Sequence, residues 1–339
     1  MSLESGKLEF APGGSIEQLK LRMPHKDRSL THINVYLVEG DSQHGALLVD
    51  TGWDSDDTFD YLKQALADRP VGQIVFTHSH PDHYGLANRL KQYCNARLYM
   101  HELERDIIQS RTNLDEEFQE IDISLQAHGT PPDELSQFHT ASPPIRQSVA
   151  PTPPDVTLHG DETITTGYFN FKVLWTPGHS PGHICLYEPD KKILLSGDHI
   201  LPTITPHVGL HPQLGGNPLG DYLASLNRLK ELEVAIVLPG HEQPFTEFRA
   251  RVEAIIQHHR FRDGQILGTL DSKSKTAYQI AHEISWVDDI NGVSLDKLDH
   301  FNQRMAILET ISHLEEMRAN REVDRFSRDD IIHYQRHLS

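Results

Sequence analysis

The chain has 339 residues, with 49 acidic residues against 31 lysines and arginines, so its formal net charge is −18. This charge disfavours nucleic acid or an anionic membrane as the main partner. No apolar run approaches the roughly 18 residues of a membrane helix, the first residues do not resemble a signal peptide, and two cysteines give no disulfide framework. We therefore expect a cytoplasmic protein with one large domain and one small one.

Strands and helices alternate in the first hundred residues. The apolar runs 33–40 (INVYLVEG) and 45–52 (GALLVDTG) both end in glycine, which is typical of paired strands. Residues 54–69 have the acidic first turn and the apolar spacing of a helix. Residues 96–102 predict a further strand, and residues 221–232 a further helix.

Five apolar runs end in an acidic residue or a histidine, and this recurrence is the most informative feature of the chain. A short apolar run bounded by glycine or proline is typical of a buried strand, so each polar side chain would lie just beyond a strand end. The runs are ALLVDTG (Asp50), IVFTHSHPDHYG (His78, His80, Asp82, His83), VLWTPGHSPGH (His179), ILLSGDH (Asp198) and AIVLPGH (His241). Five histidines and two aspartates that meet at one edge of a sheet would form a two-metal site, which implies hydrolysis.

The His-x-His-x-Asp-His cluster has the ligand types of such a site. Imidazole nitrogens and carboxylate oxygens suit zinc, iron and manganese. His78 and His80 can point the same way from an extended segment, whereas Asp82 and His83 turn toward a neighbouring position. Pro81 is typical of the first residue of a helix, which we expect to run onward from it. A strand–loop–helix corner of this kind can serve two metal ions about 3.5–4 Å apart.

Taken together, these motifs make the sequence resemble the metallo-β-lactamase-fold hydrolase superfamily over residues 15–250. THSHPDHYG matches its signature loop, and the other motifs follow in its order. The resemblance implies a mixed α/β fold, a four-layer αββα sandwich of two sheets with helices outside. It also implies three ligands for a first metal ion, three for a second and one bridging ligand, which are His78, His80 and His179, then Asp82, His83 and His241, and finally Asp198.

The resemblance implies roles for the carboxylates as well. Asp50 would orient a metal ligand by hydrogen bonding. Two ions, with zinc expected first and iron or manganese as alternatives, would hold a bridging hydroxide that attacks the substrate. Asp82 and Asp198 would orient this hydroxide and carry its proton. No serine or cysteine nucleophile is needed, and we expect Cys94 and Cys185 to be small buried residues.

Departures from neighbouring families narrow the function. True β-lactamases of this fold commonly have a cysteine where Asp198 stands, and the diiron flavoproteins have a glutamate where His80 stands. Only 42 residues (positions 199 to 240) separate Asp198 from His241, too few for the extra domain of the nucleases. What remains resembles the glyoxalase II-like thioesterases. We therefore expect a small acyl substrate, an acyl-glutathione or acyl-CoA thioester first, and a lactone or other ester next.

A long segment at residues 102–155 departs from a minimal hydrolase of this fold. It begins with helical spacing and ends in a proline-rich stretch. Long connections in compact domains are commonly functional, so we expect a lid-like insertion, with a surface excursion or an oligomer contact as the alternative. In a lid, Phe138 and His139 would lie near the substrate.

A second departure is the glycine- and proline-rich loop at residues 205–220. It follows the predicted bridging aspartate and must stay near the metal ions. His207 and His211 are therefore candidates for the substrate pocket. Tyr222, just after this loop, is a candidate phenol donor in the same pocket, although packing is its ordinary role.

The last ninety residues change in character. Residues 251–267, 276–285 and 295–320 predict helices, and residues 321–337 predict two short strands joined by a polar turn. This order resembles the winged-helix-like tail of some superfamily members, including relatives of the lactamase-β-like endoribonucleases. Residues 251–339 nevertheless carry 12 Lys and Arg against 15 Asp and Glu, without the basic stripe expected for binding a phosphate backbone.

We therefore predict a catalytic domain at residues 1–250 and a small helical, winged-helix-like domain at residues 251–339. The second would pack against the first and shape the pocket mouth, or form the contact of a homodimer. Three functions stay open. The leading one is a thioester or ester hydrolase, the alternative is a metal-dependent phosphodiesterase or endoribonuclease, and the third is a catalytically silent ligand-binding protein, which the intact ligand set disfavours.

Overall fold

The chain forms two compact units in the computed structural model. The structure describes residues 6–10, 14–24, 30–110, 114–141, 150–210, 216–270, 273–286 and 292–337. The first unit comprises residues 1–112, 145–206 and 225–252, and the second comprises residues 113–144, 207–224 and 253–339. Within the described residues, no helix combines the length and the apolar character needed to cross a membrane.

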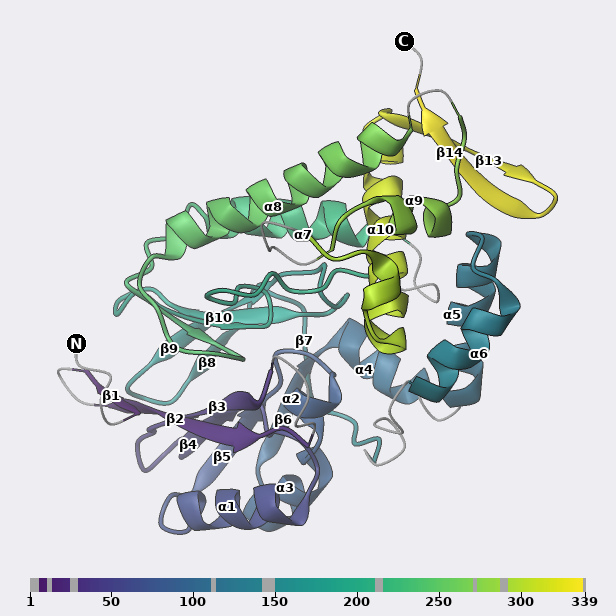
Figure 1. The fold of residues 1–339 in the computed structure, drawn as a ribbon. Coiled ribbons are helices and arrows are strands. Elements are labelled where there is room, and N and C mark those ends of the chain that lie inside the picture. The colour runs from purple at the N-terminus through teal and green to yellow at the C-terminus, as the bar shows by residue number, and fades with distance from the viewer. Residues whose placement is uncertain are drawn as a thin grey trace. The chain divides into compact units, whose positions relative to one another are not determined.

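The first unit contains two β-sheets that face each other (Figure 1). One sheet has seven strands that lie in chain order, namely β1 (Lys7–Glu9), β2 (Ser15–Arg22), β3 (His32–Val38), β4 (Ala46–Val49), β5 (Val71–Val75), β6 (Arg97–His101) and β7 (Val156–Leu158). Its strands are antiparallel from β1 to β4 and parallel from β4 to β7.

The second sheet has five strands in the order β12-β11-β10-β9-β8. These strands are β8 (Thr163–Thr165), β9 (Asn170–Trp175), β10 (Ile184–Glu188), β11 (Ile193–Gly197) and β12 (Ile236–Pro239). The β11–β12 pair is parallel, whereas the other pairs are antiparallel.

Strand β4 shows how the apolar runs build the sandwich. All of its residues are buried. Side chains alternate across a strand, so an unbroken apolar run indicates burial on both faces. Ala46 and Leu48 pack in a core that includes residues of α1 (Asp56–Leu66) and α3 (Ala87–Cys94), whereas Leu47 and Val49 join the core between the two sheets. The result is the mixed α/β sandwich that the sequence predicts.

The helix predicted to run onward from Pro81 is interrupted in the structure. Pro81 begins α2, which ends at Tyr84 (Pro81–Tyr84), and α3 starts at Ala87. Between them, Gly85 lies so close to the turn after β4 that an added Cβ would be 2.6 Å from the carbonyl oxygen of Gly52. The glycine therefore lets the histidine-rich loop pack directly against the turn that carries Asp50.

The second unit is mostly helical. One apolar core contains side chains of α5 (Leu114–Ala127), α6 (Pro132–Ala141), α9 (Ala277–Glu283), α10 (His300–Ala319), β13 (Val323–Arg328) and β14 (Ile331–Arg336). The three helices and the terminal hairpin predicted for the tail are present. The helices are α8 (Phe248–Thr269), α9 and α10, and the hairpin consists of β13 and β14. Their interpretation as a winged-helix-like domain stays a prediction, as does the domain boundary at residue 250.

The long insertion is helical over most of its described length. It contains α4 (Glu102–Ser110), which belongs to the first unit, and α5 and α6, which belong to the second. Helix α6 was not predicted, since its sequence is proline-rich, but Pro132 stands at its start, where a missing N–H costs nothing. Phe138 is fully buried in the core of the second unit, and the side chain of His139 lies outside the described residues. The role as a lid stays a prediction.

Polar side chains of β3 hold the loop that follows β12. The Asn34 side-chain amide donates hydrogen bonds to the carbonyl oxygens of Pro239 and Glu242, each at 2.9 Å. The Tyr36 hydroxyl also donates to the Pro239 carbonyl, at 2.8 Å. This loop contains His241, so the first sheet fixes the position of a predicted ligand that the second sheet carries.

Replacing Asn34 by alanine is expected to lower the free energy of unfolding by about 1–3 kcal/mol, because two carbonyl oxygens lose their buried donor. Urea denaturation measures the change. Asn88→Ala, which removes an exposed hydrogen bond with Gln92, is the control. Equal costs for the two variants would show that Asn34 does not fix the loop.

Candidate metal centre

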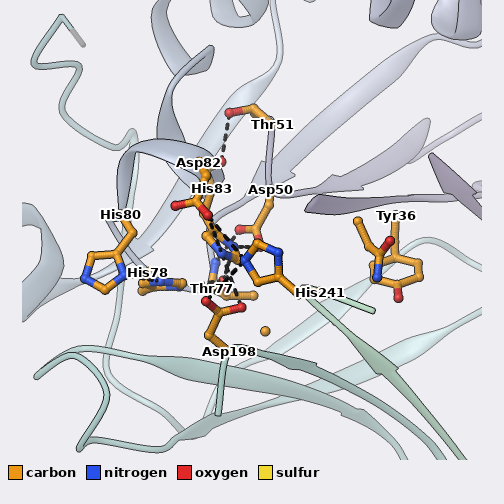
Figure 2. A network of polar contacts seen from close by, with 12 residues as sticks. Tyr36, Asp50, Thr51, Thr77, His78, His80, Asp82, His83, Asp198 and His241 are labelled. Atoms are coloured by element: carbon orange, nitrogen blue, oxygen red, sulfur yellow. Dashed lines mark hydrogen bonds and ion pairs between the residues drawn. The ribbon is translucent and has the colours of Figure 1, made fainter. Parts of the chain in front are cut away.

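The seven predicted ligands meet at strand ends of the first unit. His78 and His80 follow β5, Asp82 and His83 lie in α2, and the others follow β9, β11 and β12. Their ligand atoms form three overlapping groups, within each of which all atoms lie within 4.8 Å of one another. The first group is His78, His80 and His179, the second group is Asp82, His83 and His241, and the third, His78, His83 and Asp198, overlaps both. Figure 2 shows six of these residues converging from both sheets.

The first group consists of three imidazole nitrogens. His80 Nδ1 lies 2.9 Å from His78 Nε2 and 3.1 Å from His179 Nε2. A tetrahedral zinc ion with Zn–N bonds of about 2.0–2.1 Å would separate its nitrogen ligands by about 3.3 Å. The three nitrogens are therefore spaced as a metal-binding set.

The second group combines imidazoles with carboxylates. His241 Nε2 lies 3.2 Å from an oxygen of Asp82. Asp198 reaches into both groups, because its carboxylate oxygens lie 3.3 Å from His83 Nε2, 3.5 Å from His241 Nε2 and 3.8 Å from His179 Nε2. Asp198 therefore lies between the first group and the second.

Several buried polar atoms at the centre have no hydrogen-bond partner within the described part of the chain. Such atoms indicate whether the residues fit a metal ion. Among the described residues, His83 Nε2, His241 Nε2 and Asp198 Oδ1 are buried without a hydrogen bond of good geometry. Buried polar atoms in native proteins nearly always have a partner, such as an ion. The atoms also lie close together, with Asp198 oxygens 3.3 Å from His83 Nε2 and 3.5 Å from His241 Nε2, so the donor set fits divalent metal ions.

A hydrogen-bond chain orients two of the histidines. Asp50, buried at the end of β4, accepts from the backbone N–H and the hydroxyl of Thr77, both at 2.8 Å. Its carboxylate also lies 2.7 Å from His83 Nδ1, and the Thr77 hydroxyl lies 3.0 Å from His78 Nδ1. With both Nδ1 atoms protonated toward this chain, the Nε2 atoms of His78 and His83 are left free to bind metal.

A backbone carbonyl orients a third histidine. His241 Nδ1 donates to the carbonyl oxygen of His32 at 2.8 Å, which turns Nε2 toward the two aspartates. His183 lies next to the centre without being a predicted ligand, and its Nε2 accepts the backbone N–H of Asp198 at 3.2 Å. Backbone groups thus position the ligands on both sides of the centre.

The two groups differ in charge before any metal binds. Burial and the imidazoles of His83 and His80 hold the pKa of His78 well below its ordinary value. Burial alone would lower the pKa of His241, but Asp198 and Asp82 raise it to about 10. The carboxylates likewise outweigh burial at His83 and hold its pKa well above the usual range. Without metal, His83 and His241 therefore carry protons at the place where a second metal ion would supply positive charge.

One residue that touches the centre was missed in the sequence. Glu104 of α4 is fully buried, and its carboxylate accepts hydrogen bonds from the ligand-bearing loops. No spacing pattern in the sequence predicts this role, because the hydrogen-bond partners of Glu104 lie in loops that are far away in the sequence. Its place in the first turn of the helix that follows β6, near a strand end like the five other motifs, was the one available signal.

The candidate pocket residues lie in the second unit. His207 is half-buried, with Nδ1 at 3.4 Å from a carboxylate oxygen of Glu309. Tyr222 is fully buried, and its ring lies 5.6 Å from that of His259. His211 lies outside the described residues. The pocket role of all three stays a prediction.

This fold and these ligands define a metal-dependent hydrolase. The chain belongs to the metallo-beta-lactamase superfamily, whose family model matches residues 28–241. It is 29% identical over 264 residues to the probable metallo-hydrolase YqjP of Bacillus subtilis. The aligned region covers 74% of this chain and 79% of that protein. It is 30% identical over 227 residues to the acyl-coenzyme A thioesterase MBLAC2 of Homo sapiens, which covers 62% of this chain and 74% of that protein.

Solved structures agree with this assignment. A metallo-beta-lactamase family protein of Thermus thermophilus is 30% identical with a TM-score of 0.75, over 95% of this chain and 98% of that one. A beta-lactamase domain protein of Burkholderia ambifaria is 27% identical with a TM-score of 0.80, over 98% of this chain and 95% of that one. Both likenesses extend over nearly the whole chain.

Metal binding at the second group is expected to weaken as the pH falls from 8 to 6. The raised pKa values of His241 and His83 mean that both imidazoles carry protons in the metal-free chain, and metal must displace them. Each displaced proton costs about tenfold in affinity per pH unit. Zinc titrations at several pH values measure the effect, and an affinity at this group that does not change with pH would contradict it.

Proposed function

We propose that the chain hydrolyses small acyl thioesters with the help of two divalent metal ions. An acyl-CoA is the first candidate substrate, with acyl-glutathione and then other esters or lactones next, and zinc is the first candidate metal. The observation that carries the proposal is that Asp198 carboxylate oxygens lie 3.3 Å from His83 Nε2 of the second group and 3.8 Å from His179 Nε2 of the first. The name of the human relative, an acyl-coenzyme A thioesterase, supports the choice of substrate.

The ligand groups divide the work of holding the ions. His78, His80 and His179 would hold the first, and Asp82, His83 and His241 the second, with Asp198 between them. When bound, such ions lower the pKa of water and withdraw electron density from a carbonyl group, which is the chemistry that hydrolysis of a thioester requires.

Asp82 is the residue best placed to move a proton. Burial would raise its pKa, but His83 and His241 hold that pKa below the usual value, so the group is ionised at neutral pH. Its side chain is 15% exposed, against 10% for Asp198. Asp82 can therefore accept a proton from the attacking water and return it to the leaving thiolate, as the C–O bond forms and the C–S bond breaks.

The two cysteines do not suit a covalent mechanism. Cys185 is buried, and burial raises the pKa of its thiol to about 12. Cys94 is half-buried in α3, and burial raises its pKa too. Thiolates are the reactive form of cysteine, so neither residue is prepared to act as a nucleophile. Direct attack by water is the consistent alternative.

We further propose that segments outside the metal-binding motifs select the acyl group. The candidates are the loop with His207 and the helices α5 and α6, whose sequences match no recognised motif. A winged-helix-like fold of α8 to β14, and a homodimer contact through it, are part of this proposal. The net acidic charge of residues 251–339 disfavours a nucleic-acid substrate for this part of the chain.

Zinc-loaded protein is expected to release thiol from one or more members of a panel of acyl-CoA and acyl-glutathione thioesters. His179→Ala should reduce this rate by more than the 10–100-fold typical of residues that only orient ligands. His159→Ala, at a histidine with a 58% exposed side chain, is the matched control and should keep the rate. A thiol-reactive dye measures the release.

The contrary result is equally informative. If the protein binds zinc but cleaves no thioester, the proposed substrate class is wrong, although the metal centre stands. Phosphodiesters and single-stranded RNA would then be tested with the same pair of variants, since the helical tail with its hairpin resembles that of lactamase-β-like endoribonucleases.

A further inference from the structure

A single buried carboxylate connects the two loops that supply the first group of metal ligands. Glu104 lies in the first turn of α4 and is fully buried. One of its oxygens accepts the backbone N–H of Ser79 at 2.8 Å. The other accepts the hydroxyl of Ser180 at 2.7 Å and the backbone N–H of Gly182 at 2.8 Å.

The positions of these partners relate Glu104 to the metal ligands. Ser79 stands between His78 and His80 in the loop after β5, and Ser180 directly follows His179 in the loop between β9 and β10. The loops are about a hundred residues apart in the chain, yet His80 Nδ1 lies 2.9 Å from His78 Nε2 and 3.1 Å from His179 Nε2. Glu104 bonds to both loops next to the ligands.

The chemistry of the contacts suits an ionised carboxylate. All three partners donate, and a carboxylate offers only acceptors, so every contact is satisfied. Hydrogen bonds to a charged acceptor are short and strong. Gly182 leaves room for this approach, because a Cβ added there would lie 2.8 Å from both Cγ and the backbone nitrogen of Glu104.

We propose that Glu104 is a positioning residue for the first metal ion, acting by fixing the distance between the loop of His78 and His80 and the loop of His179. The inference rests on the proposed metal site and not on the proposed substrate. It gives α4, the first helix of the long insertion, a role at the metal centre that is separate from any lid.

Two variants disturb this contact in different ways. Glu104→Gln keeps the size of the side chain but replaces one oxygen by an amide NH₂, which would face an N–H or O–H donor and lose that contact. Gly182→Ala keeps the glutamate itself, but the added methyl group would push its side chain away from the loop. The matched control is Glu102→Gln in the same helix, whose 44% exposed carboxylate pairs with His159 instead.

The test is a zinc titration in competition with a chelator, together with the melting temperature of the metal-free protein. We expect two zinc-binding steps in the unmodified chain, one of which His179→Ala abolishes. Glu104→Gln and Gly182→Ala should weaken that same step about 10–100-fold, the usual effect of residues that orient metal ligands. Glu102→Gln should leave both steps unchanged. The absorption spectrum of the cobalt-loaded form should change in the same two variants.

Three results would overturn the inference. The first is an unchanged affinity in Glu104→Gln. The second is an equal loss in both zinc steps with a lower melting temperature of the metal-free form, which would show a purely structural role. The third is the absence of zinc binding to the unmodified chain. A failure to cleave thioesters would reject the proposed substrate but leave these zinc measurements as they are.

Discussion

The structure depends on holding close together several imidazole nitrogens whose lone pairs repel one another. Three of them lie within about 3 Å of their neighbours at the first group, and the desolvated His78 has its pKa held low by burial and by other imidazoles. Bringing lone pairs this close and out of water is unfavourable unless a cation accepts them. The sandwich and its loops therefore have to impose the geometry before the metal arrives.

Three acceptors, each on a different element, impose it. Asp50 at the end of β4 fixes His83 directly and His78 through Thr77. The carbonyl of His32 at the start of β3 fixes His241. Glu104 in α4 fixes the loops around Ser79 and Ser180. Because strands and helices carry these acceptors, the candidate ligands inherit the rigidity of the fold.

The charge of the second group complements this rigidity. Its two carboxylates face His83 and His241, so protons balance the charge in the metal-free chain. Exchange of those protons for a divalent ion changes little in the total charge.

That the seven candidate ligands lie together was predictable, because they follow apolar runs, and such runs become buried strands whose ends meet. The orienting role of Asp50 was expected from the resemblance of its VDTG segment to a family motif, and its carboxylate lies 2.7 Å from His83 Nδ1. Glu104 was not predictable, since its partners lie 25, 76 and 78 residues away and two of them are backbone N–H groups. The break between α2 and α3 depends on contact between Gly85 and Gly52, which the helical spacing of the sequence does not encode. Helix α6 was not predicted because the prolines in this segment favour an irregular structure.

The sequence also did not predict which distant segments associate. Residues 113–144 share a compact unit with residues 253–339 because their apolar faces complete one core, including Leu125 and Ile311. Amphipathic spacing indicates that a helix buries one face, but it does not identify the partner.

The central claim, a centre for two metal ions, is tested most directly by anomalous X-ray diffraction from crystals of the zinc-loaded protein. The account predicts two zinc peaks per chain. One should lie among His78, His80 and His179, and the other among Asp82, His83 and His241, with Asp198 in contact with both. A single peak, or zinc bound only elsewhere on the chain, would contradict it.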